Sequence, residues 1–378
     1  MILKALKYTR YAGEPREWYI TGRDEDYAYF GNINLFVGKN ASGKSRTLNV
    51  IREIANLLSS KITAKDAFVP TQQFDLIFKN NIGEYRYILE IKDRIVVDER
   101  LYIGGKEYLN RATKTLTDID GNTVNFDIED TELAVTKIDE KGIAYFSSLI
   151  AWAKSMRNYL FANQLEKRKL VSDYTKADGD EHDIDGRHLL VYTFYKGKEL
   201  YGEDFINEVV NGMKELDYFI SDIDIQENET GYGLCIEEEG KYIVSQQEMS
   251  QGMFRALSLF ILLAYAQFSS APFCILIDDM GEGLDFDSSK RMIDTVIRKI
   301  NKSNIQLFMT TNDRNVMNHI PLRYWSVIDR YQDKSVFYDY TNSKETFEDF
   351  KYTGLNNFDF LATDFYRKGF GIMDDEND

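Results

Sequence analysis

The sequence predicts an α/β fold with a mixed or antiparallel N-terminal sheet and a parallel core sheet flanked by helices. Three observations lead to this prediction. A strand, a glycine-rich loop and a helix follow one another between residues 32 and 58. Short alternating strands separated by turn residues fill the first 147 residues. Two short apolar runs, 273–277 and 305–309, flank a helical segment, as strands of a buried parallel sheet do.

In the N-terminal segment, 1–147, strands are expected at 2–8, 18–21 and 33–37, and later at 74–78, 85–91 and 101–103. Between these two groups, apolar residues at helical spacing predict a helix that begins at Lys44, with Leu48, Ile51, Ala55 and Leu58 on its buried face. A second helix is expected over 146–165. This arrangement places the glycine-rich loop directly between a strand and a helix.

A second segment, 148–245, is expected to be a largely helical insert with a helix at 203–216 and strands at 220–225 and 232–237. It contains an acidic run, 172–187, that lacks the spacing of a calcium-binding EF-hand loop, so a solvated loop is expected there. The third segment, 246–378, should contain a long helix with one apolar stripe formed by Met253, Leu257, Phe260, Ile261, Ala264 and Phe268.

Composition excludes several classes of protein. The chain has 378 residues, 43% of them hydrophobic, which is enough for two or three domains with large cores. Its net charge of −16 would repel nucleic acid, which could bind only through a local patch or a partner. The two cysteines, Cys235 and Cys274, are too isolated to predict a disulfide framework or a metal site. Without a signal-peptide pattern or a membrane-length apolar run, a cytoplasmic protein with no membrane contact is expected.

The loop "GKNASGKS", Gly38 to Ser45, fits the pattern G-x-x-x-x-G-K-[ST]. In such a loop the backbone N–H groups and the start of the following helix surround a phosphate. Lys44 would reach the β- and γ-phosphates, and the Ser45 hydroxyl would bind Mg²⁺. Asn40 and Arg46 are further candidates for nucleotide binding. The alternative is an ordinary glycine-rich turn.

The apolar run "FCILIDDM" ends in two adjacent carboxylates, Asp278 and Asp279. Negative charge next to a buried strand is costly unless something compensates it, and a metal ion would do so. Asp278 could then hold the water shell of Mg²⁺, and Asp279 could polarise an attacking water. An apolar strand that ends in aspartate is common, so this interpretation depends on the phosphate loop.

A third candidate is Ser250-Gln251-Gly252, at the start of the long helix. Serine is a good N-cap, and glycine tolerates unusual backbone angles, so a plain helix cap explains both residues. The functional alternative is an anion site at the helix N-terminus that closes over the nucleotide of a neighbouring subunit.

Four stretches, in the order "GKNASGKS", "MSQGMFRALSLFILLAYA", "ILIDDMGEGLD" and "LFMTTND", resemble the Walker A, signature, Walker B with D-loop, and switch segments of ABC-type ATPases. The pattern is most similar to the SMC, RecF and OLD group of these ATPases. The resemblance implies a P-loop NTPase fold with the two-lobe architecture of ABC ATPases. It also implies ATP and Mg²⁺ as cofactors and a homodimer that closes around nucleotide.

The resemblance also assigns roles by position. Gly38, Gly43, Lys44 and Ser45 would bind phosphates and magnesium, with Asp278 as the Walker B aspartate. Ser250 and Gly252 would touch the γ-phosphate across the dimer, and the D-loop would be formed by Gly283, Leu284 and Asp285. Asp279 stands where the family usually has a catalytic glutamate, and Asn312 stands where it has a histidine. Because aspartate is shorter and asparagine cannot take up a proton, slow ATP hydrolysis is expected.

Two features of the family remain open. The Q-loop glutamine has three candidates, Gln72, Gln73 and Gln164. A cluster of basic and aromatic side chains could bind nucleic acid or a partner, although a solvated helix face is favoured; its members are Trp152, Lys154, Arg157, Tyr159, Phe161, Lys167, Arg168 and Lys169.

The sequence shows neither the heptads of coiled-coil arms nor room for a TOPRIM nuclease domain after the Walker B strand. The expected function is therefore that of a nucleotide-switched homodimer that regulates a separately encoded effector, in anti-phage defence or DNA maintenance. Two alternatives are a non-catalytic ATP-binding scaffold and a DNA-repair ATPase of RecF type.

Overall fold

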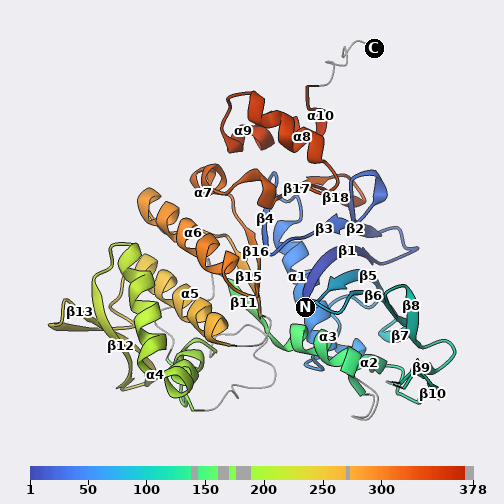
Figure 1. Ribbon diagram of the computed structural model, residues 1–378, viewed down its shortest axis with the longest axis horizontal. Helices are drawn as coiled ribbons and strands as arrows, with labels where there is room; N and C mark the ends of the chain where they lie inside the picture. The colour runs from blue at the N-terminus through green and yellow to red at the C-terminus, as the bar shows by residue number, and fades with distance from the viewer. Residues whose placement is uncertain (119, 138–143, 161–169, 176–188, 270–272, 371–378) are drawn as a thin grey trace. The chain divides into compact units, whose positions relative to one another are not determined.

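The computed structural model describes residues 1–118, 120–137, 144–160, 170–175, 189–269 and 273–370. The chain divides into two compact units, one formed by residues 1–154 with 317–378 and the other by residues 155–316 (Figure 1). The phosphate-loop candidate belongs to the first unit, whereas Asp278 and Asp279 belong to the second. The boundaries expected after residues 147 and 245 stay predictions.

The first unit contains a mixed sheet with the strand order β10-β9-β8-β7-β6-β5-β1-β2-β18-β17-β4, and β3 also pairs with β1. Pairing is antiparallel from β10 to β2 and between β17 and β18, but parallel between β2 and β18 and between β4 and β17. The strands are β1 (Ile2–Arg10), β2 (Trp18–Gly22), β3 (Ala28–Tyr29), β4 (Ile33–Val37), β5 (Gln72–Lys79), β6 (Glu84–Lys92), β7 (Ile95–Ile103), β8 (Lys106–Asn110), β9 (Thr115–Thr117), β10 (Thr123–Asn125), β17 (Trp325–Arg330) and β18 (Lys334–Asp339).

Buried and more exposed side chains alternate along the strands, so one face of the sheet is apolar, and helices pack on that face. In β5, Phe74, Leu76 and Phe78 are buried, and the residues between them are more exposed. Trp152 packs edge-to-face on Phe78, with ring centroids 4.8 Å apart. It belongs to α3 (Ala144–Lys154), which packs beside α1 (Lys44–Leu58); the short α2 (Ala134–Lys137) precedes α3.

Helix α1 follows the expected pattern, with Leu48, Ile51, Ala55 and Leu58 all buried. It begins immediately after Gly43, whose φ of 111° lies in the left-handed region that favours glycine. Strand β4 is buried along its whole length. The predicted strand–loop–helix unit around the phosphate loop is therefore present.

Three short helices end the first unit: α8 (Lys344–Asp349), α9 (Asn357–Ala362) and α10 (Phe365–Lys368) (Figure 1). Phe360 stands at the centre of their aromatic core, with its ring centroid 4.6 Å from Phe347 and 5.0 Å from Phe350. The sequence analysis did not predict these helices.

The second unit contains three parallel strands in the order β16-β15-β11, and a separate antiparallel sheet in the order β12-β13-β14. Residues Cys274 to Ile277 are fully buried, as expected for a central parallel strand. The elements are β11 (Met156–Leu160), α4 (Leu189–Glu215), β12 (Ile220–Asn228), β13 (Gly231–Glu238), β14 (Tyr242–Ser245), α5 (Gln251–Phe268), β15 (Phe273–Asp278), α6 (Phe286–Asn301) and β16 (Ile305–Thr310); the chain leaves the unit within α7 (Arg314–His319).

The helix expected over 146–165 is wrong in its second half. The helix ends at Lys154, and residues Met156 to Leu160 form β11, which pairs in parallel with Cys274 to Asp278. Backbone hydrogen bonds to a strand far along the chain outweigh the local helical pattern here. Residues 161–165 lie outside the described residues.

The long helix α5 is more deeply buried than one stripe would require. Every residue from Phe254 to Ala264 is buried, while Phe268, expected on the apolar stripe, is 38% exposed. A helix that is apolar on all sides packs against neighbours on all sides, and α4 and α6 both contact it. Within the described part of the chain, no helix combines the length and the apolar character needed to cross a bilayer.

Candidate functional site

The phosphate loop turns tightly between β4 and α1. Ala41 and Gly43 both have positive φ, 62° and 111°, and the N–H of Ser42 donates to the carbonyl of Lys39 at 3.1 Å. Left-handed residues within such a loop let successive backbone N–H groups turn toward one side, which creates a concave site for an anion. Lys39, Asn40, Ala41 and Ser45 are exposed, whereas Gly38, Ser42 and Lys44 are buried.

The Lys44 ammonium lies against the loop. Its Nζ donates to the carbonyls of Gly38 at 2.9 Å and Lys39 at 3.4 Å, so the side chain folds back over the turn. At the start of the helix, Thr47 donates from both its N–H and its hydroxyl to the carbonyl of Gly43, at 2.8 and 3.0 Å. The two Lys44 bonds keep its ammonium group next to the exposed turn.

Gly38 is required by close packing. A Cβ at this position would lie 2.5 Å from the Ser42 Oγ and 2.6 Å from the Ile328 carbonyl oxygen, distances that side chains do not tolerate. The Ser42 Oγ is itself buried and makes no hydrogen bond to any described residue. A buried hydroxyl without a partner is costly, and a bound phosphate oxygen would satisfy it.

Strands β17 and β18 hold the loop from outside. Arg330, the last residue of β17, donates to the Ala41 carbonyl at 2.8 Å, and the Ser335 hydroxyl donates to the Ser42 carbonyl at 3.0 Å. Lys39 forms an ion pair with Asp364 at 3.4 Å. Because the partners in each pair are at least 289 residues apart in the chain, no local sequence pattern could have indicated them.

Arginine side chains gather around the same loop. Arg10 and Arg46 lie over the Trp18 ring, with guanidinium carbons 5.0 and 4.6 Å from its centroid. Partial burial, followed by the positive charges of Arg10 and Arg330, lowers the pKa of Arg46. The Arg10 Nε is buried and has no hydrogen-bond partner among the described residues. This accumulation of positive charge, in a chain of net charge −16, suits a polyanion.

In the second unit, Asp278 and Asp279 stand at the end of β15, and Thr310 of the neighbouring β16 connects them. The Thr310 hydroxyl donates to the Asp278 carboxylate at 2.5 Å and accepts from the Asp279 N–H at 2.9 Å. The sequence analysis missed Thr310, although its position at the end of a parallel strand beside β15 could have indicated it.

The two positions that depart from the ABC pattern contact each other. The Asn312 side-chain amide donates to the Asp279 carboxylate at 3.2 Å. Asp279 has a φ of 57°, in the left-handed region that aspartate tolerates better than most residues. Asn312 is exposed and Asp279 is half-buried, so both side chains are accessible.

The signature and D-loop residues also lie together in the second unit. Ser250 caps α5 by accepting from the Met253 N–H at 3.1 Å, as the simpler interpretation expected. A Cβ on Gly252 would lie 3.3 Å from the Gly283 carbonyl oxygen, and Arg255 donates to the Glu282 carbonyl. Asp285 caps α6, accepting from the N–H and the hydroxyl of Ser288 at 2.9 and 2.6 Å. The start of α5 is thus packed on the D-loop.

The structure also locates candidates for the Q-loop glutamine and part of the basic and aromatic cluster. Gln72 is fully buried and bonded to Tyr8, Glu53 and Val69, and Gln73 bonds to Glu90 at 3.2 Å; Gln164 lies outside the described residues. The basic cluster is not one helix face, because Trp152 is buried on α3 and Arg157 follows on β11. Phe161, Lys167, Arg168, Lys169 and most of the acidic run 172–187 lie outside the described residues.

The phosphate loop offers backbone N–H groups and a lysine, which fit an anion. Among the described residues, no group of three or more His, Cys, Asp or Glu side chains could hold a metal by itself. A phosphate loop needs no such group, because phosphate oxygens themselves supply ligands to Mg²⁺.

The chain has the same fold as solved SMC heads. One is the SMC head bound to the C-winged helix domain of ScpA, with 14% identity, a TM-score of 0.53, and coverage of 89% of this chain and 97% of that one. Another is the SMC head with an extended coiled coil bound to the C-terminal domain of ScpA, derived from Pyrococcus furiosus. It has 14% identity, a TM-score of 0.50, and coverage of 92% and 99%. The expected P-loop NTPase fold of the ABC and SMC type is therefore confirmed.

The family follows from the sequence comparison. Residues 33–318 match the family described as "AAA domain, putative AbiEii toxin, Type IV TA system", and the chain belongs to this family. It is an AAA-type ATPase whose fold is that of SMC heads. A comparison with curated proteins gives no match.

Proposed function

We propose that the chain binds Mg·ATP, hydrolyses it slowly, and uses the bound nucleotide to join two copies that regulate a separately encoded effector. The observation that carries the proposal is the phosphate loop of the first unit. It combines left-handed Ala41 and Gly43 with the positive charges of Lys44, Arg46 and Arg330. Family membership supports ATP as the nucleotide.

The proposed roles follow the chemistry of each side chain. The backbone N–H groups of the loop, with Gly38 and Gly43 allowing the turn, hold the β-phosphate, and Lys44 contacts the β- and γ-phosphates. Asn40 and Arg46 contribute further contacts. The resemblance to ABC-type ATPases assigns Ser45 and Asp278 as ligands of Mg²⁺, which would neutralise negative charge on the phosphate oxygens.

We further propose that Asp279 orients the attacking water and accepts its proton, while Asn312 fixes the Asp279 carboxylate by the hydrogen bond between them. Asparagine cannot itself accept a proton, and the aspartate reaches less far than a glutamate would. Both properties favour binding and switching over rapid turnover.

In the proposed homodimer, Ser250 and Gly252 of one copy contact the γ-phosphate held by the other. The exposed start of α5 supports this role, since its first N–H groups and helix dipole attract an anion. Asp285 and the D-loop pack beneath Gly252, and they would communicate between the two nucleotide sites of the dimer whether ATP is bound. The family description, with its toxin and type IV toxin–antitoxin system, favours an effector partner in defence over a membrane transporter.

The test is ATP binding and phosphate release by the full chain, compared with Lys44→Ala and with Lys92→Ala, an exposed lysine at the end of β6. We expect Lys44→Ala to weaken Mg·ATP binding at least tenfold and abolish phosphate release, and Lys92→Ala to change neither. Equal binding by all three proteins would refute the proposal. Tight binding with no Lys44-dependent phosphate release would favour the non-catalytic scaffold, whereas stimulation by DNA would favour the RecF-type alternative.

A further inference from the structure

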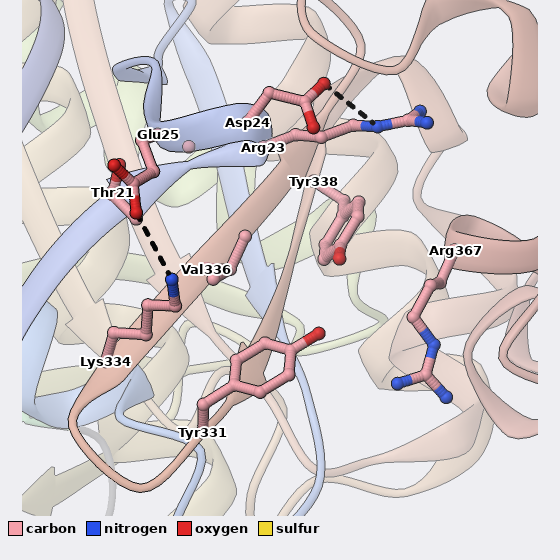
Figure 2. A pocket seen from close by; sticks show the side chains of 10 residues that line it. Thr21, Arg23, Asp24, Glu25, Tyr331, Lys334, Val336, Tyr338 and Arg367 are labelled. Carbon is pink, nitrogen blue, oxygen red and sulfur yellow. Dashed lines mark hydrogen bonds and ion pairs between the residues drawn. The ribbon is translucent and has the colours of Figure 1, made fainter.

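A cavity of about 420 Å³ lies in the first unit, on the side of β18 that faces away from the phosphate loop. Its walls come from the end of β2, the turn at residues 23–25, the β17–β18 hairpin and α10. Figure 2 shows Tyr331 between Lys334 and Arg367, with Val336 and Tyr338 above it in the view. The volume falls within the range of small-molecule sites, roughly 300 to 1,000 Å³.

Alternation along β18 explains why this strand serves two sites. Lys334, Val336 and Tyr338 point into the cavity, whereas Ser335, between them, points the other way and bonds the phosphate loop. On the parallel neighbour β2, Thr21 pairs with Val336 and also lines the cavity. The cavity therefore has a rigid floor made of two adjacent strands.

The walls offer aromatic and apolar side chains together with positive charge. Tyr331, Val336 and Tyr338 can stack against a planar ring. Burial, and then a hydrogen bond with Tyr331, raises the pKa of Tyr338, so its hydroxyl stays protonated and can donate to an anion.

The positive side chains of the cavity all have acidic partners at its edge, and Arg367 donates to Asp329 at 3.3 Å. Arg23 pairs with Asp24 at 3.6 Å, and Lys334 with Glu25 at 3.5 Å (Figure 2). The side chains of Asp24 and Glu25 are 90% and 74% exposed, so water can replace either pair at little cost. An incoming anion could therefore take over Lys334. Because acidic side chains stand on the same wall, the site suits one anionic group better than a polyphosphate.

We propose that this cavity is a second ligand site, for a small molecule that carries a planar ring and a single anionic group such as a phosphate monoester, and that its occupancy is relayed to the phosphate loop. The relay runs through the β17–β18 hairpin, because Arg330 and Ser335 on either side of its turn bond Ala41 and Ser42. Arg367 of the cavity also pairs with Asp364, which pairs with Lys39.

The site is tested by calorimetric titration of the full chain with nucleoside 5′-monophosphates, the parent nucleosides and inorganic phosphate. We expect at least one monophosphate to bind at least tenfold more tightly than its nucleoside or phosphate alone. Arg367→Ala and Lys334→Met should each weaken it at least tenfold. The matched control is Lys368→Ala, the neighbouring exposed residue of α10, which does not line the cavity and should bind like the unaltered chain.

Titration of Lys44→Ala separates this site from the phosphate loop. Monophosphate binding that survives in Lys44→Ala and is lost in Lys334→Met supports the second site. Binding lost only in Lys44→Ala, or no binding by any monophosphate, overturns it. Because α10 is short, unfolding of Arg367→Ala is checked by thermal melting, and Lys334→Met on the strand then decides alone.

The relay rests on the proposed function and needs its own measurement. A saturating monophosphate should change the affinity for Mg·ATP at least threefold, and Ser335→Ala should remove most of that change while leaving monophosphate binding intact. An unchanged ATP affinity would disprove the relay. Failure of ATP to bind at all would instead refute the proposed function, and the direct titration would still report on the cavity.

Discussion

Asp279, the proposed catalytic base, occupies a strained backbone position. Its φ of 57° costs most L-residues about 1 kcal/mol, and aspartate and asparagine less than others. Two hydrogen bonds hold the residue there, one from the Asp279 N–H to Thr310 and one from the Asn312 amide to its carboxylate. An aspartate in place of the usual glutamate is therefore consistent with the backbone angle as well as with slow chemistry.

The backbone angle at Asp279 predicts how Asp279→Asn and Asp279→Glu change stability, and the proposed catalytic role predicts how Asp279→Asn changes turnover. Asparagine keeps the left-handed preference and a carbonyl acceptor for Asn312, so stability should change by less than about 0.5 kcal/mol, yet turnover should fall about a hundredfold or more if Asp279 is the base. Glutamate should lower the free energy of unfolding by about 1 kcal/mol. Urea unfolding and phosphate release measure the two effects. A stable, equally active Asp279→Asn would remove Asp279 from the mechanism.

Thr310 is a second residue whose role can be isolated. Thr310→Val preserves the shape but removes the hydroxyl that bonds Asp278 and the Asp279 N–H. The loss of these bonds at a buried position should cost about 1 to 3 kcal/mol. Thr123→Val, at an exposed position of β10, is the control. Equal unfolding free energies for Thr310→Val and Thr123→Val would contradict the prediction.

At the scale of elements, the end of β18 depends on a buried carboxylate. Asp339 is 2% exposed and accepts from the N–H groups of Tyr29, Thr341 and Asn342 at 3.1, 2.8 and 3.1 Å. Burial nevertheless raises the pKa of Asp339 to about 6, with a smaller upward contribution from Asp26. The turn after β18 is therefore sensitive to pH.

The sign of this effect follows from proton binding. Between the unfolded pKa of 3.8 and the folded pKa of about 6, the folded state binds the proton more strongly, so stability is lost as pH rises. We expect the unfolding free energy of the unaltered chain, minus that of Asp339→Asn, to fall by up to about 3 kcal/mol from pH 3.5 to 7. Urea unfolding of both proteins across this range measures it. A difference that stays constant or rises would show that the pKa is not raised.

The elements also show what sequence patterns can predict. The strand at 33–37, the helix from Lys44 and the apolar run 273–277 were predicted because burial and periodicity act within a few residues. Strand β11 was mistaken for helix because only its pairing with β15 makes it a strand. The ties from Arg330 and Ser335 to the loop, and the cavity beside them, arise from long-range topology that no local pattern encodes.

At the scale of the whole molecule, the net negative charge opposes association of two copies, whereas the basic phosphate loop favours binding of a nucleotide that two copies could share. A net charge of −16 disfavours self-association, whereas a nucleotide shared by two copies would overcome that repulsion. The proposed dimer should therefore depend on ATP.

The cap of α5 provides the sharpest test of this dimer. Aspartate and asparagine both cap helices as well as serine, so Ser250→Asp and Ser250→Asn should both keep α5 folded. Only the aspartate places a negative charge toward the proposed γ-phosphate, and two like charges about 4 Å apart repel by several kcal/mol at a protein surface. In an Asp279→Asn background with Mg·ATP, sedimentation should show dimers for Ser250→Asn and monomers for Ser250→Asp, with ATP binding by the monomer unchanged. Dimers in both variants would place Ser250 outside the interface, and monomers in both would leave the chain without a nucleotide-joined pair.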